Sequence, residues 1–65
     1  MTIVINGESR DLPDGSTVAD AVSLLGAAAG VAVAVNDDVI SRSLWAATRL
    51  AGGDTVEILT AVQGG

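Results

Sequence analysis

A single segment of helical periodicity lies between segments that alternate as β-strands do, and this order limits the fold more than any other feature. Val18, Ala21, Val22 and Leu25 fall at positions i, i+3, i+4 and i+7, so they form one apolar face of a short helix. One helix of this length can cover only one face of a sheet. We therefore expect an α+β protein in which the helix lies across one face of a mixed sheet of four or five strands.

The strands are predicted from β-branched residues and from the turns between them. The segment 2–6 alternates as a strand, and Asn6-Gly7 is a strong hairpin signal because both central residues of that turn need positive φ. The segment 8–12 would return antiparallel to it. Three further strands are predicted, at 31–35, 39–40 and 55–59.

The ends of the helix and the long connections carry their own signals. Thr17 can accept a hydrogen bond from a free amide of the first turn, and Asp20 follows three residues later, as in a capping box. Gly26 can end the helix in a left-handed conformation. The segment 27–30 is compatible with a longer helix or with a loop. Residues 43–47 are predicted to form a turn or 3₁₀ segment.

The composition limits the chemistry that the chain can perform by itself. Its 65 residues allow one domain, and they include no cysteine and no histidine. A thiolate nucleophile, a zinc-thiolate site and the usual general base near neutral pH are therefore all missing. The chain is therefore poorly equipped for conventional enzyme catalysis, and we do not expect a metal site.

The charge of the chain bears on its partners. The net charge is -5, and arginine supplies all three basic residues. This balance argues against binding to nucleic acid or to an anionic membrane, and it suits a partner with a basic docking surface or simply solubility. Neither a signal peptide nor a transmembrane run is recognisable, so we expect a cytoplasmic protein.

The last residues form the candidate functional element. If Leu59 ends the final strand, the sequence divides into a domain at 1–59 and a flexible tail at 60–65 that ends in Gly64-Gly65. Extended, this tail would reach roughly 20 Å beyond the domain. Glycine has no Cβ and can thread a narrow channel, so the terminal carboxylate could enter the active site of a neighbouring protein.

Three segments carry a family resemblance that spans essentially the whole chain. They are Asp54 to Gly65, Arg42-Ser43-Leu44-Trp45, and Val33-Ala34-Val35-Asn36, and together they resemble the ThiS family, the sulfur carriers of thiamin thiazole synthesis. The resemblance implies a β-grasp, or ubiquitin-like, fold with the first and last long strands side by side and parallel. One departure is Ser41, where the family usually has proline before the arginine. It loosens that turn and leaves the tail untouched.

The resemblance also implies a mechanism and a set of partners. An E1-like adenylyltransferase of the ThiF type would use ATP to convert the Gly65 carboxylate into an acyl-adenylate. A persulfide donor such as a cysteine desulfurase would then supply the sulfur that displaces AMP, and a thiazole synthase of the ThiG type would receive it from the Gly65 thiocarboxylate. Gln63 and Gly64 would be recognised as part of the tail. The carrier would bind no cofactor stably, and we expect it to be a monomer alone.

Three apolar residues are candidates for the partner interface. Trp45 is the only aromatic residue, and it is interpreted first as a core anchor and second as a docking contact. Leu59 and Val62 flank the tail, where partner contact and burial within the strand are both open.

Other functions remain open at this point. A carrier for molybdopterin or cysteine synthesis would share the fold and the Gly-Gly end, although molybdopterin carriers usually approach that end through prolines. The segments 12–18 and 53–60 also resemble TGS domains, which are non-covalent regulatory binding modules. A ubiquitin-like protein modifier is the third alternative.

Overall fold

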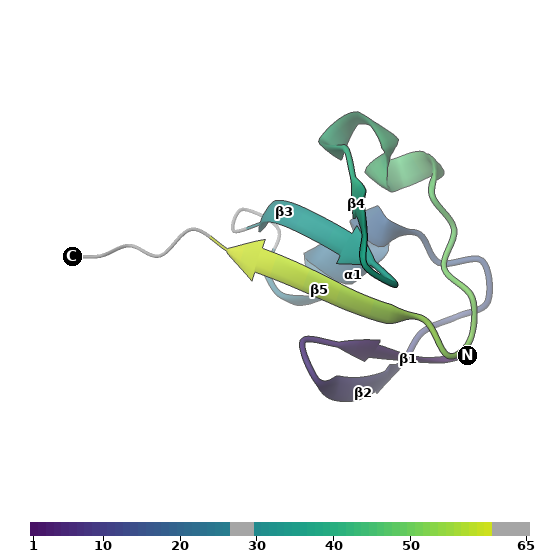
Figure 1. Ribbon diagram of the computed structural model, residues 1–65. Helices are drawn as coiled ribbons and strands as arrows, with labels where there is room; N and C mark the ends of the chain where they lie inside the picture. The colour runs from purple at the N-terminus through teal and green to yellow at the C-terminus, as the bar shows by residue number, and fades with distance from the viewer. Residues whose placement is uncertain (27–29, 61–65) are drawn as a thin grey trace.

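The computed structural model describes residues 1–26 and 30–60 and shows a five-stranded sheet with one α-helix across one face (Figure 1). The elements are β1 (Thr2–Ile5), β2 (Glu8–Asp11), α1 (Val18–Leu24), β3 (Gly30–Val35), β4 (Asp38–Ile40), the 3₁₀ helix η2 (Arg42–Ala47) and β5 (Thr55–Thr60). The structure confirms the predicted α+β class and the prediction that the helix covers one face of the sheet. No helix in the described part of the chain is both long enough and apolar enough to span a membrane.

The sheet places the last strand at its centre. The strand order is β2-β1-β5-β3-β4, and β5 runs parallel to β1 and antiparallel to β3. The parallel register pairs Val4 with Thr55 and Ile5 with Val56. The first and last strands are therefore parallel neighbours, as the β-grasp prediction states.

The core lies between the sheet and α1. Alternate residues of the three inner strands turn toward the helix, because side chains in a strand alternate between its two faces. The buried residues are Ile3, Ile5, Leu12, Val18, Ala21, Val22, Val33, Trp45, Leu50, Val56 and Ile58. Most are aliphatic, as expected of a core whose packing must stabilise a chain without disulfides.

The helix begins where its capping signal predicts. The Thr17 hydroxyl oxygen accepts a hydrogen bond from the Asp20 backbone N–H at 3.3 Å, and an Asp20 carboxylate oxygen accepts one from the Thr17 backbone N–H at 2.8 Å. These reciprocal bonds make a complete capping box with aspartate in place of glutamate. The helix ends at Leu24, one residue before Leu25, the last position of the predicted apolar face, and Gly26 has the expected left-handed φ of 88°.

The two hairpins turn at asparagines with positive φ. Asn6 has φ of 50° and Gly7 has φ of 83°, which confirms the predicted turn between β1 and β2. Asn36 and Asp37, with φ of 49° and 73°, form the turn between β3 and β4. Asparagine and aspartate enter this region more easily than most residues because their short side chains can form local hydrogen bonds.

The final strand is longer than predicted. Thr60 belongs to β5, where it pairs with Gly30 across the sheet, so the final strand ends one residue after its predicted end at Leu59. Gly30 likewise belongs to β3 and not to a helix or a loop. Residues 27–29 and the rest of the predicted tail, 61–65, lie outside the described residues.

Candidate functional site

The described part of the chain ends at Thr60, on the central strand β5. Ile58 points into the core and is 4% exposed, whereas its neighbour Leu59 is 67% exposed on the opposite face. That face carries no helix, because α1 covers only the side of Val56 and Ile58. The central strand therefore displays a large apolar side chain to solvent one residue before its last residue, Thr60.

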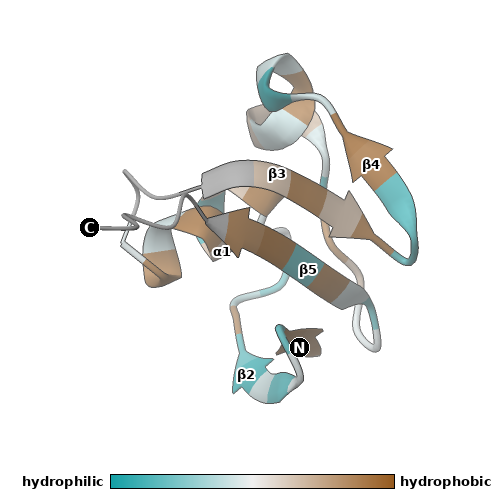
Figure 2. Ribbon diagram, turned by 60° about the vertical axis from the view of Figure 1, so that its left-hand side comes forward, coloured by the Kyte–Doolittle hydropathy of each residue, from teal (hydrophilic) through white to brown (hydrophobic). Residues whose placement is uncertain are grey.

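An apolar surface surrounds Leu59. The strand register brings together Ala32, Ala34, Val39 and Leu59, which we call the open-face patch, and Figure 2 shows the hydrophobic stretches of β3, β4 and β5 side by side. Val39 is 79% exposed. A shallow hollow of about 190 Å³ lies among these residues, and Glu57 is the only charged side chain that lines it. Exposed apolar side chains gathered in this way are typical of a protein-binding surface.

Trp45 lies away from this patch. Its side chain belongs to the helix-side core, its residue is 9% exposed, and its indole N–H donates a hydrogen bond to the Ile40 carbonyl oxygen at 2.9 Å. The guanidinium of Arg42 lies 5.3 Å from the centre of the indole ring, within the range of a cation–π contact. The structure thus does not bring Trp45 and Leu59 together, and it gives Trp45 the contacts of a core anchor.

The other predicted site residues belong to the tail. Val62, Gln63, Gly64 and Gly65 lie outside the described residues, so their roles stay predictions. Of the candidate interface residues, Leu59 alone lies both in the described chain and on an exposed surface.

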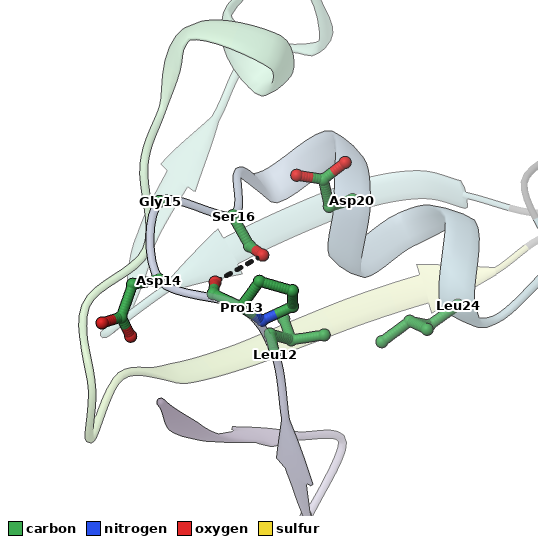
Figure 3. Close-up of a pocket in the computed structure, with 7 residues that line it drawn as sticks. All are labelled: Leu12, Pro13, Asp14, Gly15, Ser16, Asp20 and Leu24. Atoms are coloured by element: carbon green, nitrogen blue, oxygen red, sulfur yellow. Dashed lines mark hydrogen bonds between the residues drawn. The ribbon is translucent and has the colours of Figure 1, made fainter.

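A larger hollow on the helix side offers no catalytic arrangement. It has a volume of about 440 Å³ and is lined by Leu12, Pro13, Asp14, Gly15, Ser16, Asp20 and Leu24 (Figure 3). The Ser16 hydroxyl donates a hydrogen bond to the Pro13 carbonyl oxygen at 2.7 Å, and the Asp20 carboxylate is engaged in the helix cap. Asp14 forms an ion pair with the N-terminal ammonium at 3.3 Å. No group in this hollow is placed to take the proton from the serine.

The described residues also contain no gathering of three or more acidic, cysteine or histidine side chains that could hold a metal ion.

Three members of the open-face patch, Ala32, Ala34 and Val39, were not singled out from the sequence, and neither was Glu57, which lines the same hollow. Within each strand the alternation was a usable signal, since Ala32 and Ala34 alternate with the larger valines, and Glu57 shares its strand face with Leu59. The pairing of β3 with both β4 and β5 joins these half-faces into one surface.

The sheet order, the single helix of the described residues and the exposed face on the central strand define a small β-grasp protein. The profile of the ThiS family matches residues 3–65. The chain belongs to the ThiS family, whose members are sulfur carriers of thiamine biosynthesis and not enzymes.

Solved structures agree with this assignment. The chain is similar to the crystal structure of the thiamine biosynthesis protein ThiS from Geobacter metallireducens, with 28% identity, full coverage of both chains and a TM-score of 0.77. A solution structure of a thiamine biosynthesis protein from the same organism gives 32% identity, a TM-score of 0.79, and coverage of 100% of this chain and 88% of the other. No curated protein matches the chain significantly in sequence.

Proposed function

We propose that this sulfur carrier holds its sulfur as a thiocarboxylate on Gly65. A carboxylate is a poor electrophile, so an adenylating partner of the ThiF type would first join it to the α-phosphate of ATP and release pyrophosphate. The outer sulfur of a persulfide on another protein would then attack the acyl carbon and displace AMP. A thiol would cleave the S–S bond of the resulting acyl disulfide, which leaves the thiocarboxylate on Gly65 and converts the thiol and the inner persulfide sulfur into a disulfide. The thiocarboxylate would deliver this sulfur to a thiazole synthase of the ThiG type.

The position of β5 is the observation that carries this proposal. The central strand ends at Thr60, and the family match continues to Gly65. Residues 61–65 can span at most roughly 18 Å, which is enough to carry a carboxylate from the domain into a partner's active site. The partner would supply the ATP site, the base and the nucleophile, so a chain without cysteine and histidine is sufficient for this role.

The open-face patch suits an activating partner of matching chemistry. An apolar surface on the partner would cover Leu59 and Val39, and a basic side chain would meet Glu57, which lines the same hollow. The net charge of -5 would favour encounter with a basic docking surface. Trp45 would support this arrangement indirectly, by anchoring η2 against the helix side of the core.

The proposal is tested by the intact mass of the protein after incubation with ATP, a ThiF-type enzyme, a persulfide donor and a thiol reductant. The expected result is a gain that corresponds to one oxygen replaced by one sulfur, and fragmentation should place this gain on the last residue. The reaction without ATP is the control and should leave the mass unchanged. A gain located on an internal residue, or no gain with a partner that loads a known carrier, would contradict the proposal.

Replacing Leu59 by aspartate should weaken the encounter with the activating enzyme. The change puts a carboxylate in the apolar patch beside Glu57, and a central interface residue contributes about 2 kcal/mol or more, so kcat/KM for adenylation should fall about 30-fold. The rate is measured as pyrophosphate release at limiting carrier concentration.

The matched control for this variant is Leu24→Asp. Leu24 is also an exposed leucine, 46% exposed, but it lies on the helix, which covers the other side of the sheet. Its replacement should leave kcat/KM nearly unchanged. Equal losses in the two variants would show that added negative charge, and not the patch, controls docking.

A further inference from the structure

The central strand is held from both sides by asparagine side chains. At its start, Asn36 comes from the end of β3: its amide oxygen accepts a hydrogen bond from the Thr55 N–H at 3.0 Å, and its amide nitrogen donates to an Asp54 carboxylate oxygen at 3.0 Å. The Asn36 backbone N–H also donates to the Thr55 carbonyl oxygen at 2.8 Å. These bonds fix the turn that leads into β5.

Asn6 makes the corresponding contacts near the other end of β5. Its backbone N–H donates to the Val56 carbonyl oxygen at 3.0 Å. Its amide oxygen accepts a hydrogen bond from the Ile58 N–H at 2.8 Å, and its amide nitrogen donates to the Ile58 carbonyl oxygen at 3.1 Å. One side chain thus satisfies both backbone groups of a residue that lies 52 positions away in the sequence.

The Asn6 amide takes the place of a missing strand residue. The parallel ladder pairs β1 with β5 only at Val4 and Ile5, whereas β5 continues to Thr60. A primary amide offers one acceptor and a donor pair, so it can mimic the C=O and N–H that a longer β1 would have presented. Buried backbone groups without partners are costly, and Ile58 is 4% exposed. Asn6 therefore extends the β1 edge as far as Ile58.

We propose that Asn6 is a positioning residue for the C-terminal arm of the carrier. By holding Ile58 in the sheet, it keeps Leu59 on the open face and fixes the point from which the chain leaves the domain. The inference rests on the proposed function, because it concerns the delivery of Gly65 to the activating enzyme.

The physical reason is preorganisation. Without the Asn6 amide, the β1 side of β5 would be secured only as far as Val56, and the end of the strand would be held by β3 alone and would open more often. The partner would then have to order Ile58 and Leu59 during docking, which costs conformational entropy. The end group would also be tethered from an earlier and less defined point, which lowers its effective concentration in the partner's active site.

The test compares Asn6→Gly with Asn36→Gly. Both asparagines have φ near 50°, which glycine adopts readily. Each variant loses two side-chain hydrogen bonds, to Ile58 in Asn6→Gly and to Asp54 and Thr55 in Asn36→Gly. Melting temperatures, backbone amide exchange and the kinetics of adenylation are measured for the full chain, at a temperature where both variants remain folded. Asn36→Gly therefore controls for the loss of a comparable side-chain clamp at the start of β5, away from Ile58.

Asn6→Gly is expected to speed exchange of the Ile58 amide by about tenfold, because local opening no longer breaks a hydrogen bond to the side chain. It should also lower kcat/KM for adenylation about fivefold, mainly through KM, because the arm must be ordered on docking. Asn36→Gly should speed exchange at Thr55 instead and leave kcat/KM within about twofold of the wild type, since the exit of β5 is unchanged.

A second variant covers the case in which Asn6→Gly does not fold. Asn6→Asp tolerates the positive φ and keeps an acceptor for the Ile58 N–H, but at neutral pH it has no donor for the Ile58 carbonyl oxygen. Asn6→Asp should raise KM for adenylation, whereas Asn36→Asp should leave KM unchanged.

A positioning role is overturned if the Asn6 and Asn36 variants change KM equally, or if neither changes it. If the wild type itself gains no sulfur, the proposed function fails and this inference fails with it; if the wild type is loaded normally, only the role of Asn6 is at stake.

Discussion

Removal of Gly65 is expected to reduce sulfur loading at least about 100-fold, because a displacement of even 1 Å at a reacting group can cost that much. The shortened chain still ends in a glycine carboxylate, at Gly64, but this group lies about 3.5 Å short of the position that the full chain reaches. Docking should be nearly unaffected, since the open-face patch is intact. The loss should therefore appear in kcat, measured as thiocarboxylate formed per enzyme at saturating carrier.

The matched control keeps the length of the chain and changes a neighbouring side chain. Gln63→Ala retains the Gly64-Gly65 end and removes only a side chain that we expect the partner to recognise, so it should weaken loading far less than the deletion does. The melting temperature should be unchanged in both variants, because the core residues lie between Ile3 and Ile58. A deletion variant that loads sulfur as fast as the wild type would show that Gly65 is not the reactive group.

The elements with strong local signals could be predicted from the sequence. The capping box depends on Thr17 and Asp20, which lie within one helical turn, and the first hairpin depends on Asn6 and Gly7, which are adjacent. The structure confirms both. Such features need no knowledge of the rest of the fold, since the interacting groups meet as soon as the local backbone forms.

The features that could not be predicted depend on partners distant in the sequence. Thr60 is a strand residue because Gly30 pairs with it across the sheet, and nothing in residues 55–65 alone specifies that pairing. Asn6 illustrates the same limit: its place in a turn follows from the Asn-Gly pair, but its clamp on Ile58 follows from the parallel register of β1 with β5. A register is a property of two strands together, so it is not contained in either segment.

The candidate site divides in the same way. Leu59 was singled out because it lies beside the tail, and the structure places it on an exposed face. Ala32, Ala34 and Val39 join it only through the order of the strands, so the open-face patch emerged with the fold.

Trp45→Ala is expected to have the largest effect on stability. Truncation of a buried aromatic residue costs about 3–5 kcal/mol, which approaches the whole free energy of unfolding of a small domain, about 5 kcal/mol at the low end of the usual range. The ring packs in the helix-side core, and its loss also leaves the Ile40 carbonyl oxygen without the indole donor. The variant should be largely unfolded or unfold at much lower urea, as followed by circular dichroism, since Trp45 is the only aromatic residue of the chain.

Trp45→Phe separates the two interpretations of this residue. Phenylalanine keeps most of the buried ring but has no N–H for the Ile40 carbonyl oxygen, so it should cost clearly less than alanine, with about 1 kcal/mol arising from the lost hydrogen bond. Once folded, this variant should be adenylated with nearly the wild-type kcat/KM, because Trp45 and Leu59 lie on different sides of the sheet. A core anchor thus affects stability first, and activity only through the unfolded fraction. The opposite pattern, with stability unchanged and KM raised in both variants, would identify Trp45 as a docking contact and not a core anchor.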